Sequence, residues 1–207
     1  MSFFDEMFAD SETTRLCYRK YYSWLNSPEQ KNIVKRKDEA ENVFRRTGIT
    51  FNVYSEKEET EKLIPFDLIP RILGDEEWRI IKKGVEQRVR AINSFLFDIY
   101  HQQEIIKANI IPHGLINQND AFLPEMIGFT PPNGIYTHIA GIDLVRTSEK
   151  EFLVLEDNVR TPSGVSYMIE NRETMYNMFP ELFSKIKVRS VTEYPSELIK
   201  ALKASHP

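Results

Sequence analysis

The sequence predicts a mixed α/β or α+β fold, and three observations lead to this prediction. Apolar residues recur at spacings of three and four over residues 75–103, which is typical of a long amphipathic helix. Residues 49–54 alternate apolar and polar side chains, which indicates a strand. Two further β-type runs, 138–145 and 151–156, flank a polar connection and predict a hairpin. Long helices alternating with short strands favour a mixed domain.

Length and composition are those of an ordinary globular protein. The 207 residues, 41% of them hydrophobic, can form one large domain or one and a half small ones. A net charge of −4 without a Lys/Arg block argues against a nucleic-acid partner. Cys17, the single cysteine, excludes an internal disulfide and fits a reducing compartment. The acidic start and the lack of a long apolar run argue against a signal peptide and a membrane span, so a cytoplasmic protein is expected.

The first third of the chain is expected to contain an aromatic arm, a helix and a strand. Residues 1–26 are rich in aromatic side chains and are expected to pack on the domain as an arm or short helix. Residues 27–46 carry an N-cap, an early proline and a following Gly48, so they predict a helix. Its expected buried stripe is Ile33, Val34, Val43 and Phe44. After the strand at 49–54, residues 55–62 are interpreted as a charged connection, and the prolines in 63–73 exclude a long helix there.

The strongest helix is expected to begin at Asp75 and to end near Gln103. Arg88 and Arg90 lie off its apolar stripe. They could bind a substrate carboxylate or phosphate, although solvated or salt-bridged arginines are several times more common. His101 lies near the negative end of the helix dipole, where a structural role is preferred. The residues expected on the buried stripe are Trp78, Ile81, Val85, Val89, Ile92, Leu96 and Ile99.

The second half alternates loops with two more helices. Residues 105–137 are rich in proline and are expected to form short strands and long loops. His113 and His138 lack a zinc-binding spacing, so a zinc site is not expected. Residues 165–179 and 194–207 each predict a helix. The residues expected partly inside the first of these are Val165, Met168, Ile169, Met175 and Phe179.

The hairpin predicts a cluster of oxygen ligands at one end. If residues 147–150 form a four-residue loop, Asp143 pairs opposite Val154 and shares a face with Glu156 and Asn158. Two carboxylates and one amide carbonyl suit Mg²⁺, which keeps several waters and takes further ligands from phosphates. The alternative interpretation is a polar turn with solvated charges, which is commoner for an acidic segment after a strand.

A candidate anion site follows directly. Arg160, Thr161, Ser163 and Gly164 offer a guanidinium, two hydroxyls and a flexible backbone at a predicted helix start. Arg172 could point back at this site or pair locally with Glu170, and the two interpretations are equally weighted. The sequence lacks a phosphate-binding P-loop motif, a dinucleotide fingerprint and a serine-hydrolase elbow.

The run LEDNVRTPSGVSYMIENR, preceded by THIAGIDLVR, resembles the circularly permuted ATP-grasp family related to glutathionylspermidine synthase. Earlier segments such as ITFNVY, PFDLIPRIL and FLPEMIGFTPPNGIYTHI resemble the same family, so the likeness covers nearly the whole chain. The resemblance implies part of an ATP-grasp fold and an ATP-dependent carboxylate–amine ligase. It implies that Asp143, Glu156 and Asn158 bind Mg²⁺, with Arg160 and the Ser163-Gly164 turn near the phosphoryl or carboxylate group.

Two departures from the family pattern qualify this resemblance. The synthase has an arginine just before its first metal-binding aspartate, where this chain has 140–142, Ala-Gly-Ile; Arg146 comes soon after. Family members also continue past the equivalent of residue 207 with the lysines that grip the nucleotide. One ATP-grasp-like module is therefore expected over 1–207. Its expected parts are an aromatic N-terminal arm (1–26), a helix-rich part (27–133), a site hairpin with its helix (134–180), and a C-terminal helix that is truncated relative to the family (181–207).

The resemblance leaves several functions open. The favoured hypothesis is a ligase module that acts on ATP and a small carboxylate or amine substrate and needs a partner chain or a missing C-terminal half. The first alternative is a non-catalytic binding module with the same fold. The second is a metal-dependent hydrolase of phosphate esters, ranked last because only one convincing carboxylate pair is visible.

Overall fold

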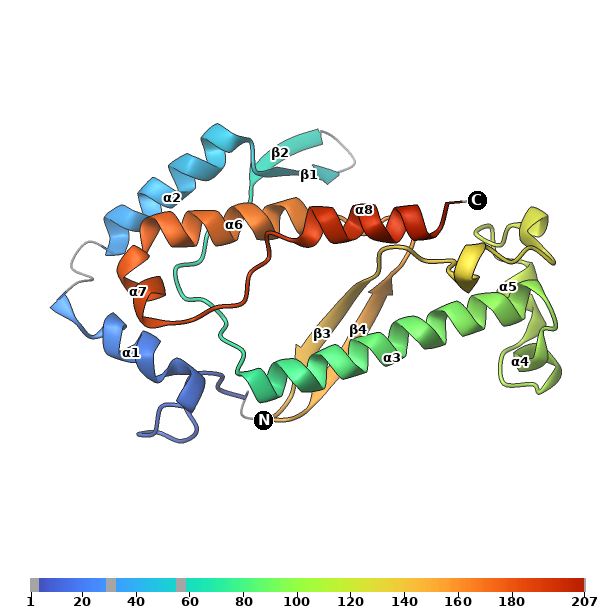
Figure 1. Cartoon of the computed structure of the whole chain (residues 1–207), viewed down its shortest axis with the longest axis horizontal. Helices are drawn as coiled ribbons and strands as arrows, with labels where there is room; N and C mark the ends of the chain where they lie inside the picture. The colour runs from blue at the N-terminus through green and yellow to red at the C-terminus, as the bar shows by residue number, and fades with distance from the viewer. Residues whose placement is uncertain (1–3, 29–32, 55–58, 207) are drawn as a thin grey trace. The chain divides into compact units, whose positions relative to one another are not determined.

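The computed structural model describes residues 4–28, 33–54 and 59–206. It contains helices and two antiparallel two-stranded sheets, so the predicted mixed fold class is confirmed. The chain forms two compact units. Figure 1 shows the helices and strands of both. The first unit is Met1–Asp75 with Gly164–Thr192, and the second is Glu76–Ser163 with Glu193–Pro207. Their action as the single predicted module, 1–207, stays a prediction. Within the described ranges, no helix has the length and apolar character that crossing a bilayer requires.

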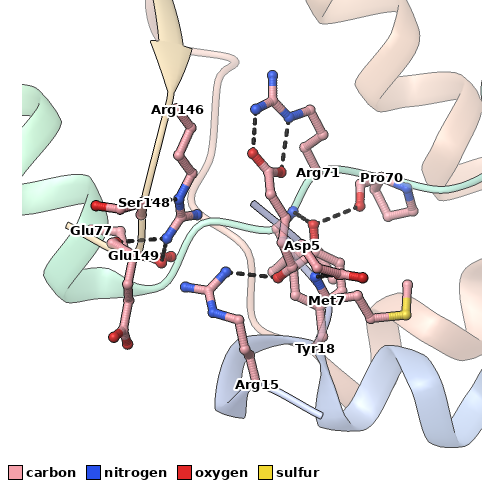
Figure 2. A network of polar contacts seen from close by, with 12 residues as sticks. Asp5, Met7, Arg15, Tyr18, Pro70, Arg71, Glu77, Arg146, Ser148 and Glu149 are labelled. Carbon is pink, nitrogen blue, oxygen red and sulfur yellow. Dashed lines mark hydrogen bonds and ion pairs between the residues drawn. The ribbon is translucent and has the colours of Figure 1, made fainter. Parts of the chain in front are cut away.

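The first unit is built around an aromatic core. Tyr21, Phe44 and Phe179 are its largest fully buried side chains. Burial raises the pKa of Tyr21 to about 12. The Tyr18 hydroxyl donates to the Pro70 carbonyl at 3.4 Å (Figure 2). It also accepts a hydrogen bond from the Ile72 amide at 2.8 Å, so this buried polar group is satisfied. The helices and strands of this unit are η1 Leu16–Tyr18, α1 Arg19–Leu25, α2 Ile33–Thr47, β1 Thr50–Tyr54, β2 Glu59–Leu63, α6 Val165–Met178 and α7 Pro180–Lys185.

The predicted packing of the aromatic N-terminal segment is confirmed. Tyr18, Tyr21 and Trp24 are buried in the core of the first unit. The Trp24 ring meets Phe179 edge-on, with centroids 5.3 Å apart. Aromatic pairs in this geometry stabilise a core beyond the area that they bury. Residues 1–3, and with them Phe3, lie outside the described residues.

The helix predicted over 27–46 is confirmed over Ile33–Thr47, while 29–32 lie outside the described residues. Phe44 is buried as expected, but Val34 is 71% exposed and does not belong to the stripe. Ala40, four residues before Phe44, takes the buried position instead. Gly48 adopts φ +72° after the last turn, which confirms its role in ending the helix.

The interpretation of 55–62 as a connection is wrong for its second half. Residues Glu59–Leu63 form β2, which pairs antiparallel with β1 so that Thr50 lies opposite Leu63 and Tyr54 opposite Glu59. Glu and Lys have low strand propensity, which is why the segment resembles a loop in sequence. Backbone hydrogen bonding to β1 outweighs that propensity. The proline-containing stretch that follows β2 forms no helix, as predicted.

The second unit contains the long helix α3, Asp75–Tyr100, apart from its first residue, together with the β3–β4 hairpin (Figure 1). The strands predicted within 105–137 are wrong, because the described residues form short helical turns there. Proline starts two of these turns, where its missing amide costs nothing. The other elements of this unit are α4 Glu104–Lys107, α5 His113–Asn117, η3 Pro124–Met126, η4 Pro132–Gly134, β3 Gly141–Arg146, β4 Phe152–Asn158 and α8 Tyr194–Ala204.

The stripe predicted on α3 is confirmed only in part. Ile99 is buried and the five residues expected between Trp78 and Ile99 are half-buried, but Trp78 itself is exposed. The helix ends at Tyr100, earlier than predicted, and the chain turns before Gln103, which adopts the left-handed φ of 54°. His101 has a structural role, since its ring nitrogens contact the Phe97 carbonyl at 2.8 Å and the Thr130 hydroxyl at 3.0 Å.

Helix α6 follows the predicted 165–179 closely. Met175 and Phe179 are buried as expected, and Val165 and Ile169 are half-buried. Met168 is exposed, so its assignment to the interior is wrong. The predicted C-terminal helix is confirmed as α8.

Glu181 at the start of α7 gives the first unit a pH-dependent contact. Partial burial raises the pKa of its carboxyl, but hydrogen bonds from Arg36 and Trp24 outweigh this and leave the pKa below the ordinary 4.5. A carboxyl with a lowered folded-state pKa stabilises the fold above its unfolded pKa and loses that contribution as pH falls through the folded pKa. We expect Glu181→Gln to melt below the wild type at pH 7 and the gap to narrow below pH 4.5. Melting curves from pH 7 to pH 3 measure this, and Glu173→Gln, an exposed carboxylate on α6, should show no such gap.

Candidate functional site

The register of the β3–β4 hairpin differs from the predicted one. The connecting loop is 147–151, one residue longer than expected, and the Thr147 amide closes it by donating to the Glu151 carbonyl at 3.2 Å. Asp143 pairs with Glu156, so its predicted pairing with Val154 is wrong. Leu144 pairs with Val154, and the register shifts between Asp143 and Leu144, which leaves Leu155 as the extra residue of a bulge.

The bulge nevertheless places the predicted ligands together. Directly paired residues and residues two apart share a face of a sheet, so Asp143, Glu156 and Asn158 lie on one face at the end of the hairpin. All three are exposed. The Asn158 side-chain amide donates to Glu156 Oε1 at 2.8 Å, which keeps these two side chains together.

Gly141 lies opposite Asn158 and makes room for it. A Cβ atom at Gly141 would lie 3.1 Å from Pro162 Cβ and 3.4 Å from Asn158 Cβ. Both distances are tight for carbon atoms, so a side chain here would push on Asn158 or on the segment that follows it. The glycine thus lets the chain after β4 pass close to the start of β3.

The donor set suits an open site for a magnesium ion better than a metal site that is closed by protein ligands. Across the described ranges, no group of three or more His, Cys, Asp or Glu side chains could hold a metal ion. Mg²⁺ needs fewer protein ligands, because it retains waters and binds through one or two carboxylates plus substrate phosphates. Asp143 and Glu156 supply the carboxylates. Asn158 uses its side-chain amino group in the contact with Glu156, and its side-chain carbonyl oxygen is an atom of the type that Mg²⁺ prefers.

The opposite face of the hairpin is held by α3. Asp157 lies between Glu156 and Asn158 but points to the other face. Arg88 of α3 donates from Nε to Asp157 Oδ1 at 2.7 Å and from a terminal nitrogen to Oδ2 at 2.6 Å. These hydrogen bonds hold the pKa of the Asp157 carboxyl below its usual value and raise that of Arg88. Arg88 is therefore salt-bridged, the commoner of its two expected roles.

Arg146 fixes the loop end of the hairpin. Its guanidinium donates to the backbone carbonyls of Ser148 at 3.0 Å and Glu149 at 2.7 Å (Figure 2). It also forms an ion pair with Glu77 of α3 and lies over the Phe152 ring, 5.0 Å from its centroid. Arg146 alternates with Val145 and so faces away from Asp143. These contacts give Arg146 a structural role in the hairpin. Arg146 does not replace the arginine that precedes the first metal-binding aspartate in the synthase.

A third polar contact from α3 supports the chain just before β3. The buried Asn93 accepts hydrogen bonds from the amides of Tyr136 at 2.7 Å and Thr137 at 3.2 Å. Its own amide donates to the Val89 carbonyl at 3.0 Å. Satisfied buried amides fix the backbone that they bind. Sequence reasoning missed Asn93, although its position four residues after Val89, on the apolar stripe, was an available signal.

The predicted anion-binding residues divide between the two units. Arg160, Thr161 and Ser163 follow β4 in the second unit and are exposed. None of their side chains has a hydrogen-bond or ion-pair partner among the described residues. Gly164 belongs to the first unit, where it precedes α6 with φ +96°, a conformation that favours glycine. These residues belong to two different units, and their convergence stays a prediction.

Arg172 has a different partner from either of its two expected ones. It lies on α6 in the first unit and donates to the Arg189 carbonyl at 2.8 Å. Arg189 in turn pairs with Asp75 at 2.7 Å. The residue therefore ties α6 to the segment before α8, and a role in anion binding stays a prediction.

The mixed fold and the paired acidic side chains on one face of a hairpin define a protein with a candidate cation site. Comparison with known proteins gives the family: residues 70–207 match the model of a circularly permuted ATP-grasp. The chain belongs to this family, which confirms the resemblance.

Relatives extend along almost the whole chain. An uncharacterised protein of Synechocystis sp. is 38% identical over 97% of this chain, and one of Mycobacterium tuberculosis is 41% identical over 98%. A protein of Frankia casuarinae, provisionally named as a glutamate–cysteine ligase, is 35% identical over 77% of the chain. The chain spans 42%, 36% and 18% of these relatives, respectively.

Proposed function

We propose that the chain is a ligase-type ATP-grasp module whose hairpin binds Mg²⁺ and the phosphates of ATP. The observation that carries this proposal is the exposed face formed by Asp143, Glu156 and Asn158. Asp143 and Glu156 are directly paired across the hairpin, and a hydrogen bond joins the Asn158 amide to Glu156. Family membership supports ATP as the nucleotide. Bound Mg²⁺ would neutralise phosphate charge and orient the phosphoryl group.

The residues after β4 would bind the charged groups of the substrates. Arg160 is exposed and without a partner in the described ranges, so its guanidinium is available for a phosphoryl or carboxylate oxygen. The hydroxyls of Thr161 and Ser163 and the backbone at Gly164 would add hydrogen bonds. Arg172 keeps N–H groups besides the one that binds the Arg189 carbonyl, and we include it as a second anion ligand.

The proposed reaction joins a carboxylate to an amine. The carboxylate oxygen attacks the γ-phosphorus of ATP and ADP leaves, which forms an acyl phosphate. The amine nitrogen then attacks the acyl carbon, phosphate leaves and the nitrogen loses a proton, which forms an amide. The provisional name of the Frankia relative, a glutamate–cysteine ligase, supports amide formation between two small molecules. We expect turnover to need groups from a partner chain or from the additional length of the relatives.

Calorimetric titration with Mg²⁺–ATP tests the binding step. The wild-type chain should bind, and Glu156→Ala and Asn158→Ala should each weaken binding at least about tenfold, or about 1.4 kcal/mol. Glu149→Ala is the matched control, because this exposed loop carboxylate lies at the other end of the hairpin. Equal heats in all four proteins would place the site elsewhere. No heat with the wild type would favour the alternative of a non-catalytic binding module.

A further inference from the structure

The ion pair between Arg88 and Asp157 has no part in the proposed chemistry, yet it lies directly behind the proposed metal ligands. We propose that Arg88 is a positioning residue, which fixes the Glu156 and Asn158 ligands for Mg²⁺ by holding Asp157 through two hydrogen bonds. This inference rests on the proposed function and extends it to α3. The two hydrogen bonds of Arg88 go to Asp157 and not to the proposed ligands, so Arg88 acts on them through its partner.

The backbone at this end of β4 has few other restraints. Leu155, the extra residue of the bulge, interrupts the regular ladder immediately before Glu156. The strand ends at Asn158, so residues 156–158 are a short paired segment between an irregularity and a strand end. Asp157 is the middle residue of this segment. Fixing its side chain on one face therefore fixes the direction in which its two neighbours point on the other.

The geometry of the contact suits this role. A guanidinium that donates two parallel hydrogen bonds to one carboxylate fixes both distance and orientation, which a lysine at the same place could not do. Arg88 lies in the middle of the 26-residue α3. The same helix holds the hairpin loop through Glu77 and the approach to β3 through Asn93. Helix α3 thus supports the hairpin at three places. The Arg88 contact is the nearest of the three to the proposed ligands, because its partner Asp157 lies between Glu156 and Asn158 in the chain.

Because the Arg88–Asp157 pair is partly exposed, its effect on metal affinity can be separated from its effect on the stability of the fold. The Arg88 side chain is 43% exposed and that of Asp157 is 23% exposed. Ion pairs of this kind contribute little to the stability of the whole fold. Losing the pair should therefore change the melting temperature only slightly, while metal affinity should fall, because supporting contacts behind metal ligands strongly affect affinity.

Titration of the full chain with Mn²⁺ alone, as a stand-in for Mg²⁺, tests the proposal in Arg88→Met. Electrostatics alone predicts that removing a positive charge near a cation site tightens binding. Positioning predicts the opposite sign, a loss of about tenfold in affinity. Arg90→Met is the matched control, since it removes the same charge from the same helix and Arg90 pairs only loosely with Glu86, at 3.8 Å. It should leave Mn²⁺ affinity unchanged or slightly higher.

Two further variants connect the effect to the pair. Asp157→Asn should weaken Mn²⁺ binding as Arg88→Met does, and the double variant should be no weaker than either single one. Amide hydrogen exchange at residues 156–158 should be faster in Arg88→Met than in Arg90→Met. Wild-type affinity in Arg88→Met, with normal exchange, would overturn the positioning role and leave the metal site intact. A wild-type chain that binds no Mn²⁺ would instead overturn the metal site and the inference that rests on it.

Discussion

Glu77→Gln is expected to lower the free energy of unfolding of the second unit by about 3–5 kcal/mol, because it leaves the buried charge of Arg146 without its carboxylate. The Arg146 side chain is only 2% exposed and that of Glu77 11%. A charge that cannot reach water needs its partner far more than a surface charge does. Denaturant-dependent hydrogen exchange of α3 and the hairpin measures the loss in this unit.

The control for this prediction is one residue away. Glu76→Gln makes the same chemical change at an exposed position of α3 and should change the unfolding free energy by less than about 0.5 kcal/mol. Replacing both members of the pair, as Glu77→Leu with Arg146→Met, should recover part of the loss because no buried charge is left alone. Equal stability of Glu77→Gln and Glu76→Gln would contradict the role given to the pair.

Phe179→Ala is expected to destabilise the first unit by about 3–5 kcal/mol, the usual cost of removing a large buried ring. The Phe179 side chain is 0% exposed and lies at the junction of α6 and α7. Trp24 meets it edge-on, and the Arg36 guanidinium lies 5.3 Å from the ring centroid. Removal of the ring would therefore eliminate these aromatic and cationic contacts together with the apolar burial.

The fluorescence of Trp24 reports the unfolding of the first unit directly. The chain has two tryptophans, and Trp78→Phe removes the one on α3 in the second unit, which is exposed. In that background, urea unfolding followed by Trp24 fluorescence should shift strongly to lower urea for Phe179→Ala. Leu16→Ala, at a position 78% exposed in the same unit, should not shift it. A small shift for Phe179→Ala would mean that the aromatic core of the first unit is not what holds it.

The shared face of Asp143, Glu156 and Asn158 could be predicted from sequence even though the register of the hairpin could not. The loop is one residue longer than expected, and this alone would put Asp143 opposite Leu155 and Glu156 on the other face. The bulge at Leu155 adds a second single-residue shift, which returns Asp143 and Glu156 to one face. Alternation thus gave the right face, while the pairing depended on two local irregularities that leave little trace in sequence.

The elements that sequence could not predict depend on contacts between distant residues. Long helices such as α3 carry their own periodic pattern, and Gly48 marks a helix end through its backbone freedom alone. Strand β2 has no such pattern, because its pairing with β1 outweighs its charged composition. The contacts of Arg88 with Asp157 join residues 69 apart in the chain, and spacing alone does not reveal them.

The central claim is that the exposed face of the hairpin binds a divalent cation, and paramagnetic broadening tests it most directly. Mn²⁺ added to the isotope-labelled chain should broaden the amide signals of Asp143, Glu156 and Asn158 first, and Glu156→Gln should remove this selectivity. Broadening centred on another acidic segment, or spread evenly over the surface carboxylates, would contradict the site. Broadening confined to this end of the hairpin in the wild type, and lost in the variant, is the result that we predict.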